Sequence, residues 1–178
     1  RCSRTTTNYY TKIESLKLAV ASLTSQLNTA DPDTKYVRTA AVSYEARMYT
    51  PVSFNWGTAH TLKYVQDLVA DGGTDSSDAM SRAYSDLIKT SEDTAHKNKN
   101  GQTPSKFIVF MTDGDNNYTT ADTATKQWCD QAKAAGIEVY SVAFMAPSRG
   151  QALLNYCATS SAHYFAAEDA DDLNAAYE

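Results

Sequence analysis

The stretch 107-FIVFMTDGDNN-117 contains five consecutive apolar residues followed directly by a loop rich in Asp and Asn. Strands of a parallel sheet that is covered on both faces have unbroken apolar sequences instead of alternating ones. The run from 107 to 111 therefore predicts a central strand of an α/β sheet. The loop after it then lies at the carboxyl edge of the sheet, where open α/β sheets bind their ligands.

The rest of the chain alternates between predicted helices and strands. Apolar residues spaced three and four apart predict a first helix, and they are Ile13, Leu16, Val20, Leu23 and Leu27. Further strands are predicted at 36–46, 48–54, 137–144 and 164–166, the first two antiparallel to each other. Further helices are predicted at 60–70, from 79 to 88, at 120–135 (closed by Gly136 in a left-handed conformation), at 151–159 and at 169–177. The polar stretch 93–105 is predicted to be a surface connection.

This alternation predicts one domain over residues 1–178, a doubly wound α/β fold with a mostly parallel sheet flanked by helices. One feature departs from the class. The chain begins with a helix, whereas such a domain normally begins with a strand that ends in the middle of the sheet.

Composition limits the partners. The chain has 178 residues, is 42% hydrophobic and carries a formal net charge of -5. This negative charge argues against nucleic acid or an anionic membrane as the main partner. No apolar run approaches the length of about 18 residues that a membrane-spanning helix needs.

The three cysteines are Cys2, Cys129 and Cys157. They are too few for a disulfide scaffold and lack the C-x-x-C spacing typical of zinc sites. Cys129 and Cys157 fall on successive predicted helices with a strand between them, a separation compatible with a disulfide. Two small buried side chains are an equally good interpretation.

The sequence contains a second polar loop, 72-GGTDSSD-78, which stands directly before a predicted helix. The first polar loop, 112-TDGDNN-117, stands directly after a predicted strand. Hydroxyl and carboxylate oxygens brought together at the carboxyl edge of a sheet are ligands that hard divalent cations accept. Each loop also has a simpler interpretation. Thr74 is a suitable cap for the helix after it, and 113–115 is a suitable polar turn.

The two loops resemble elements of a known domain. A GGT loop that opens a helix and an apolar strand that ends in TDG are similar to the second and third elements of the metal-ion-dependent adhesion site of von Willebrand factor A domains. The resemblance implies that Thr74 coordinates Mg²⁺ or Mn²⁺ directly and that Asp113 holds it, often through water. It also implies that Asp75, Asp115 and Asn116 lie near the site, where a partner protein binds.

The first element of that site, D-x-S-x-S at the tip of the opening strand, is absent. The resemblance puts it just before Arg1, because the helix that begins near Lys12 is similar to the one that follows this element. The sheet is therefore expected to lack its first central strand, which leaves 107–111 as a long apolar edge that aggregates unless a strand pairs with it. The hypothesis is that the parent protein contains this strand.

The C-terminal part of the sequence resembles a more specific group within this family. The segments TKQWCDQAKAAGIEVYSVAF, LLNYCATSSAHYF and DADDLNAAY look like the A-domain region of TadG-type proteins of the Tad (Flp) pilus assembly system. This likeness implies that Cys129 and Cys157 pair. It also implies an extracytoplasmic location, periplasmic or at the cell surface, with a membrane tether outside this chain and protein partners among pilus or envelope components.

The leading functional hypothesis is a non-catalytic, metal-dependent protein-binding or adhesion module. A cation held mainly by neutral hydroxyls keeps much of its charge available for a partner's carboxylate. One alternative is a Mg²⁺-dependent phosphotransfer or hydrolase domain that uses Asp113 and Asp115. Against it, the sequence has no Gly-rich phosphate loop and no lysine beside either loop. The other alternative is a structural A domain whose metal site has lost its function.

Overall fold

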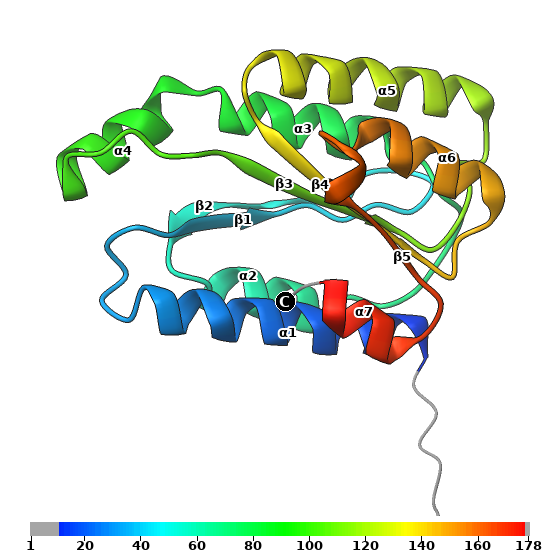
Figure 1. Cartoon of the computed structure of the whole chain (residues 1–178), viewed down its shortest axis with the longest axis horizontal. Coiled ribbons are helices and arrows are strands. Elements are labelled where there is room, and N and C mark those ends of the chain that lie inside the picture. Colours follow the sequence, from blue (N-terminus) through cyan, green and yellow to red (C-terminus); the bar gives the residue numbers. More distant parts are fainter. Residues whose placement is uncertain (1–10, 177–178) are drawn as a thin grey trace, which may run out of the picture.

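The computed structural model describes residues 11–176, which form three layers with the strands in the middle (Figure 1). One helical layer contains α1 (Lys12–Ala30), α2 (Ala59–Gln66) and α7 (Ala170–Ala176). The other contains α3 (Ser77–Leu87), α5 (Thr119–Ala134) and α6 (Ser148–Cys157), with α4 (Thr90–Asn100) at one end of the molecule. The strands are β1 (Arg38–Ala41), β2 (Val52–Trp56), β3 (Phe107–Thr112), β4 (Glu138–Phe144) and β5 (Tyr164–Ala167), and a short 3₁₀ helix η1 (Ser161–His163) precedes β5.

Strand pairing confirms the predicted α/β class. β4 lies between β3 and β5 and is parallel to both, with Phe107 opposite Glu138 and Ser141 opposite Tyr164. β1 and β2 form a separate antiparallel pair, as expected from their short connection. Because β3 and β4 both end at the same edge, the loops after Thr112 and Phe144 are close in space.

The two sheets are not hydrogen-bonded to each other, and within residues 11–176 β3 has a strand on one side only. The Lys106 carbonyl accepts the Glu138 amide, so the alternate residues Phe107 and Val109 direct their backbone groups away from β4. Their side chains are 50% and 47% exposed. The apolar edge expected from the sequence is therefore present on the side of β3 that faces away from β4, where no strand of the described chain pairs with it.

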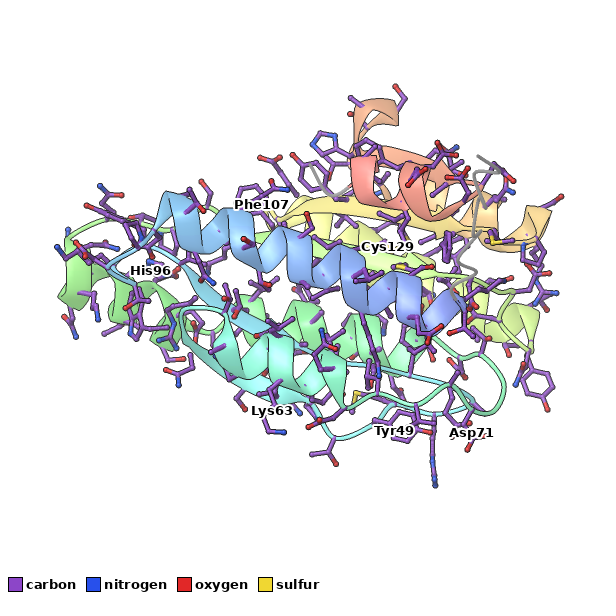
Figure 2. The ribbon with its side chains drawn as sticks, turned by 90° about the horizontal axis from the view of Figure 1, so that it is seen from below. Tyr49, Lys63, Asp71, His96, Phe107 and Cys129 are labelled. Carbon is purple, nitrogen blue, oxygen red and sulfur yellow. A yellow bond between two sulfur atoms is a disulfide. The ribbon has the colours of Figure 1, made fainter. Side chains whose placement is uncertain are left out.

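The helix α1 is likewise only partly covered. The helix begins with a reciprocal capping box in which Thr11 and Glu14 bond to each other's backbone. Its predicted apolar stripe is only half-buried, and the fully buried residues are Ser15, Ala19 and Thr24. The helix packs on α2 and α7 (Figure 2), and Ala19 also joins a buried cluster with Val142 and Phe144 of β4. An apolar stripe without a complete sheet beneath it stays partly in contact with water.

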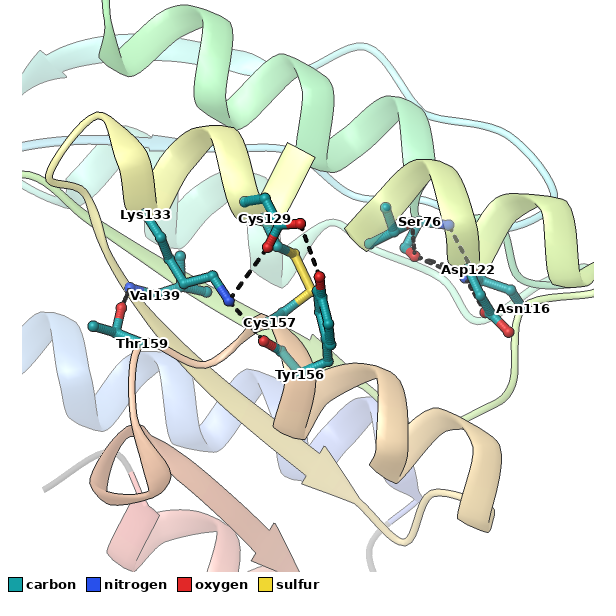
Figure 3. The surroundings of a disulfide bond; sticks show 11 residues. Ser76, Asn116, Asp122, Cys129, Lys133, Val139, Tyr156, Cys157 and Thr159 are labelled. Atoms are coloured by element: carbon teal, nitrogen blue, oxygen red, sulfur yellow. Dashed lines mark hydrogen bonds and ion pairs between the residues drawn. A yellow bond between two sulfur atoms is a disulfide. The ribbon is translucent and has the colours of Figure 1, made fainter. Parts of the chain in front are cut away.

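A disulfide joins the helical layer that covers the other face of the sheet. Cys129 on α5 and Cys157 on α6 are bonded and fully buried, with their Cα atoms 5.1 Å apart (Figure 3). Tyr156 lies next to the bond, where its hydroxyl donates to Asp130 and its carbonyl accepts from Lys133 Nζ at 2.8 Å. The side chains of Ile108, Phe110, Val139 and Leu154 complete the core around the two sulfur atoms.

The prediction of a surface connection over 93–105 was wrong, because most of this stretch belongs to α4. The helix has almost no apolar face, so hydrophobic periodicity does not reveal it. Its signals are at the ends: Glu92 and Asp93 occupy the first turn, Lys97 and Lys99 the last, and Gly101 ends it in a left-handed conformation with φ of 77°. Within the described chain, no helix combines the length and the apolar character needed to cross a membrane.

Candidate functional site

Two loops that are distant in sequence join at the carboxyl edge of β3. The Thr74 amide donates to Asn117 Oδ1 at 3.1 Å, and the Asn117 amide donates to the Thr74 carbonyl at 2.7 Å. A Cβ atom on Gly73 would lie 2.2 Å from Asn117 Nδ2, and one on Gly114 would lie 3.3 Å from Thr74 Oγ1. The two glycines therefore allow the loops to approach until the Thr74 hydroxyl lies beside the residue that follows Asp113.

A buried polar network holds these loops. Asn116 Oδ1 accepts the Ser76 amide at 2.9 Å, and Asn116 Nδ2 donates to Ser76 Oγ at 3.1 Å and to Asp122 Oδ1 at 2.8 Å (Figure 3). Ser76 Oγ is also 2.9 Å from Thr125 Oγ1 on α5. Asn116 and Ser76 are 3% and 1% exposed. Asn116 was expected near a partner, whereas its burial gives it an internal role: it fixes the loop before α3 to the loop before α5.

The amino end of α6 packs onto the same loop. The Gly150 amide donates to Asp115 Oδ1 at 2.6 Å, and a Cβ atom on Gly150 would lie 2.5 Å from the Gly114 carbonyl oxygen. Arg149 donates to the Asn116 carbonyl and forms an ion pair with Asp122 at 3.0 Å. Asp115 therefore binds the first turn of α6, where the helix dipole favours a negative charge. One oxygen of this carboxylate is therefore engaged in holding α6 against the loop after β3.

Asp75, one residue before the N-cap Ser76, stabilises the start of α3 with its side chain. Its Oδ1 accepts both the amide and the hydroxyl of Ser77, the first residue of α3, at 3.0 Å and 2.6 Å. The Asp75 amide donates to the Glu45 carbonyl at 2.6 Å. Thr74 is not the cap of α3, and its hydroxyl lies toward the loop that carries Asp113, 3.3 Å from the position of a Cβ atom on Gly114.

Asp113 is exposed and has a basic neighbour that the sequence did not suggest. Lys12 Nζ lies 3.5 Å from Asp113 Oδ2 and donates to the Asp113 carbonyl at 3.2 Å. The sequence contains no lysine beside either loop, but the fold brings the first residue of α1 to the end of β3. No local sequence motif predicts this contact, because 101 positions separate the two residues.

Two side-chain oxygen donors at this edge are the hydroxyl of Thr74 and the carboxylate of Asp113. Both are hard ligands of the kind that Mg²⁺ and Mn²⁺ accept, and Mg²⁺ usually keeps several water molecules beside one or two protein ligands. Within residues 11–176, no group of three or more His, Cys, Asp or Glu side chains is arranged to hold a metal ion. The donor chemistry fits a hard divalent cation, with the protein supplying only part of its ligands.

Comparison with known proteins gives a consistent family and fold. The family model described as von Willebrand factor type A domain matches residues 4–178. No curated protein sequence matches the chain. Among solved structures, the pilus adhesin SpaC from Lactobacillus rhamnosus GG superposes with a TM-score of 0.74 at 14% identity, over 93% of this chain and 27% of SpaC.

Two further structures are similar. The vWF domain of the type V pili tip protein Mfa5 from Porphyromonas gingivalis has a TM-score of 0.70 at 13% identity, over 93% of this chain and 86% of that one. Proximal thread matrix protein 1 from the mussel byssus, in a structure with a zinc-occupied MIDAS motif, has a TM-score of 0.67 at 15% identity, over 92% of this chain and 40% of that one. At these identities the likeness concerns the fold, and the chain spans about a quarter of the length of SpaC.

Proposed function

The chain belongs to the von Willebrand factor type A domain family, and from this we propose that its carboxyl edge is a non-catalytic, metal-dependent protein-binding site of an adhesion or assembly protein. The observation that carries the proposal is the junction of the two loops. The Thr74 hydroxyl and the Asp113 carboxylate come from separate segments, and reciprocal Thr74–Asn117 hydrogen bonds hold the segments together.

Thr74 and Asp113 are the residues that we propose hold Mg²⁺ or Mn²⁺. Thr74 offers a neutral oxygen and Asp113 a single carboxylate, so the pair neutralises only part of a divalent charge. When bound, such a cation supplies a positive centre that a carboxylate of the partner can complete. The buried Asn116 and the bonds from Ser77 to Asp75 keep the loops in place.

The surroundings of these two residues suit a protein partner. Tyr118 and Met145, which follow β3 and β4 closely in sequence, are 70% and 49% exposed. Aromatic residues and Met are enriched in protein interfaces, where they provide apolar contact area. We therefore expect Asp113 to lie at the centre of the contact and Tyr118 and Met145 at its sides.

The hydrolase alternative is weaker for a structural reason. It requires both Asp113 and Asp115, and Asp115 accepts the Gly150 amide at 2.6 Å. Turnover of a generic phosphate ester that depends on Mg²⁺ and is lost in Asp113→Ala would favour the enzyme and contradict the binding proposal.

We further propose an extracytoplasmic location, with pilus or envelope proteins as partners. The buried disulfide supports this, because such bonds persist in oxidising compartments. The pilus proteins among the similar structures agree with it. A tether to the membrane would lie outside this chain.

Selection from a displayed peptide library in millimolar Mg²⁺, with elution by EDTA, tests the binding proposal. Recovered peptides are expected to contain Asp or Glu and to lose binding when that residue becomes Asn or Gln. Thr74→Ala and Asp113→Ala are expected to abolish binding. Asp78→Ala is the matched control, since Asp78 is exposed on the first turn of α3. Binding that survives EDTA or the Asp113 substitution would contradict a metal-dependent grip.

A further inference from the structure

Lys12 brings a fixed positive charge to the carboxylate that the proposed cation needs. Its ammonium lies 3.5 Å from Asp113 Oδ2, 3.2 Å from the Asp113 carbonyl oxygen and 3.4 Å from the Met145 carbonyl oxygen. Three oxygens from the loops after β3 and β4 therefore surround one nitrogen. An exposed ion pair on a helix surface has no such set of acceptors.

The elements around Lys12 aim it at this position. The capping box of Thr11 and Glu14 fixes the first turn of α1, from which Lys12 projects. Met145 has a φ of 49°, a left-handed conformation that residues other than glycine rarely adopt. Its amide donates to the Ala167 carbonyl at 2.8 Å, while its carbonyl accepts from Lys12. The backbone after β4 thus adopts an unusual conformation that presents an oxygen to the ammonium.

We propose that the Lys12 ammonium is a tethered cation of this site and opposes the binding of a divalent cation at Asp113. This inference rests on the proposed function, because it concerns the same carboxylate. Two positive charges a few ångströms apart repel each other, and one carboxylate does not neutralise both. Lys12 therefore has to swing away from Asp113 before the carboxylate can serve a divalent cation.

The consequence is regulatory. Lys12 sets the cation concentration at which the site fills, and it couples filling to release of the first turn of α1 from the ends of β3 and β4. Removing the charge while keeping the aliphatic stem, in Lys12→Met, should strengthen binding of Mn²⁺. From Coulomb's law in water, reduced by salt screening, the dissociation constant should fall by about tenfold.

The experiment measures Mn²⁺ binding by electron paramagnetic resonance for the wild-type chain, Lys12→Met, Lys12→Arg and Lys17→Met. Lys17 is the matched control, because it lies on the same helix and donates to the Gln66 carbonyl at 2.7 Å. Lys12→Arg should bind Mn²⁺ as weakly as the wild type, and Lys17→Met should not change the affinity. Adding Asp113→Ala to Lys12→Met should remove the gain.

The outcomes separate the two proposals. Tighter binding in Lys12→Met alone supports the tethered cation, even if the wild type binds Mn²⁺ too weakly to measure. Equal or weaker binding in Lys12→Met, with clear Asp113-dependent binding in the wild type, overturns this inference and leaves the proposed function intact. Absence of Asp113-dependent binding in both forms overturns both proposals.

Discussion

Replacing Asn116 tests whether the buried network holds the two site loops together. In Asn116→Ala the Ser76 amide loses its acceptor at a position that is 1% exposed, which costs ~1–3 kcal/mol. The bond from Asn116 Nδ2 to the Asp122 carboxylate, 2.8 Å long, is also lost, and a hydrogen bond to a charged group contributes ~1.5–3 kcal/mol. We therefore expect the free energy of unfolding to fall by roughly 3–5 kcal/mol.

Asn116→Asp distinguishes the two halves of this network. The introduced carboxylate still accepts from Ser76 but lies against the Asp122 carboxylate, so its pKa is raised in the folded state. A group with a raised folded pKa favours folding at low pH, and this contribution is lost as the pH rises through that pKa. The deficit relative to the wild type should therefore shrink as the pH falls from 7 to about 4.

The assay is equilibrium unfolding in urea, followed by the fluorescence of Trp56 and Trp128, with Asn117→Ala as control. Asn117 is exposed and its side chain accepts only the Thr74 amide among the bonds described for it, so its loss should cost less than ~1 kcal/mol. If Asn116→Ala unfolds within about 1 kcal/mol of the wild type, or Asn116→Asp shows no dependence on pH, the role assigned to Asn116 is refuted.

Four further changes probe the fold. Burial raises the pKa of Asp31, but the amides of Lys35, Tyr36 and Val37, which donate to its carboxylate at 2.8 Å, lower it more, so the net pKa lies below its ordinary value. The ionised carboxylate therefore stabilises the fold at neutral pH, and this stabilisation is lost as the pH falls through the folded pKa. The stability advantage of the wild type over Asp31→Asn in urea unfolding should accordingly shrink below about pH 4, and a constant difference would contradict it. Ser141 is fully buried and its hydroxyl has no hydrogen-bond partner in the described chain, so Ser141→Ala should raise the unfolding free energy by ~1 kcal/mol, whereas a lower melting temperature would reveal a missed partner. Replacing both Cys129 and Cys157 by Ala opens a link across a sequence separation of 28 and should cost ~3–4 kcal/mol in urea unfolding; an unchanged midpoint would contradict it. Val109→Lys puts a charge on the edge of β3 that has no paired strand in the described chain, and it should reduce concentration-dependent association in sedimentation velocity. Association equal to that of the wild type would show that the chain does not self-associate through this edge.

Sequence patterns predicted the helices, strands and turns that depend mainly on residues close together in the chain. The apolar run 107–111 became β3, extended by Thr112, and Gly136 ends the turn after α5 with a φ of 77°. Buried parallel strands and left-handed glycines have distinctive sequences because their environment or backbone excludes most alternatives. The apolar stripe of α1 correctly predicted a helix, but how deeply the stripe is buried depends on what packs beneath it, which the spacing does not show.

The site was predictable only in part. The loop motifs indicated Thr74 and Asp113, and they say nothing about Lys12, which reaches the site through the packing of α1. Asn116 and Asp115 look like exposed polar residues in the sequence, and their roles depend on Ser76, Asp122 and the first turn of α6. Polar residues in a loop can face a partner or hold the loop, and only the three-dimensional arrangement separates the two.

NMR of the ¹⁵N-labelled chain with substoichiometric Mn²⁺ tests whether a divalent cation binds where the loops 72–76 and 113–117 meet. Mn²⁺ broadens amide resonances in its neighbourhood. Broadening should be strongest in these two loops, in the first turn of α1 and in the neighbouring loop after β4, whose Met145 carbonyl also contacts Lys12, and Asp113→Ala should abolish it. Broadening centred instead on the acidic residues Glu168, Asp169, Asp171 and Asp172, or no broadening in the two loops, would contradict cation binding at this position.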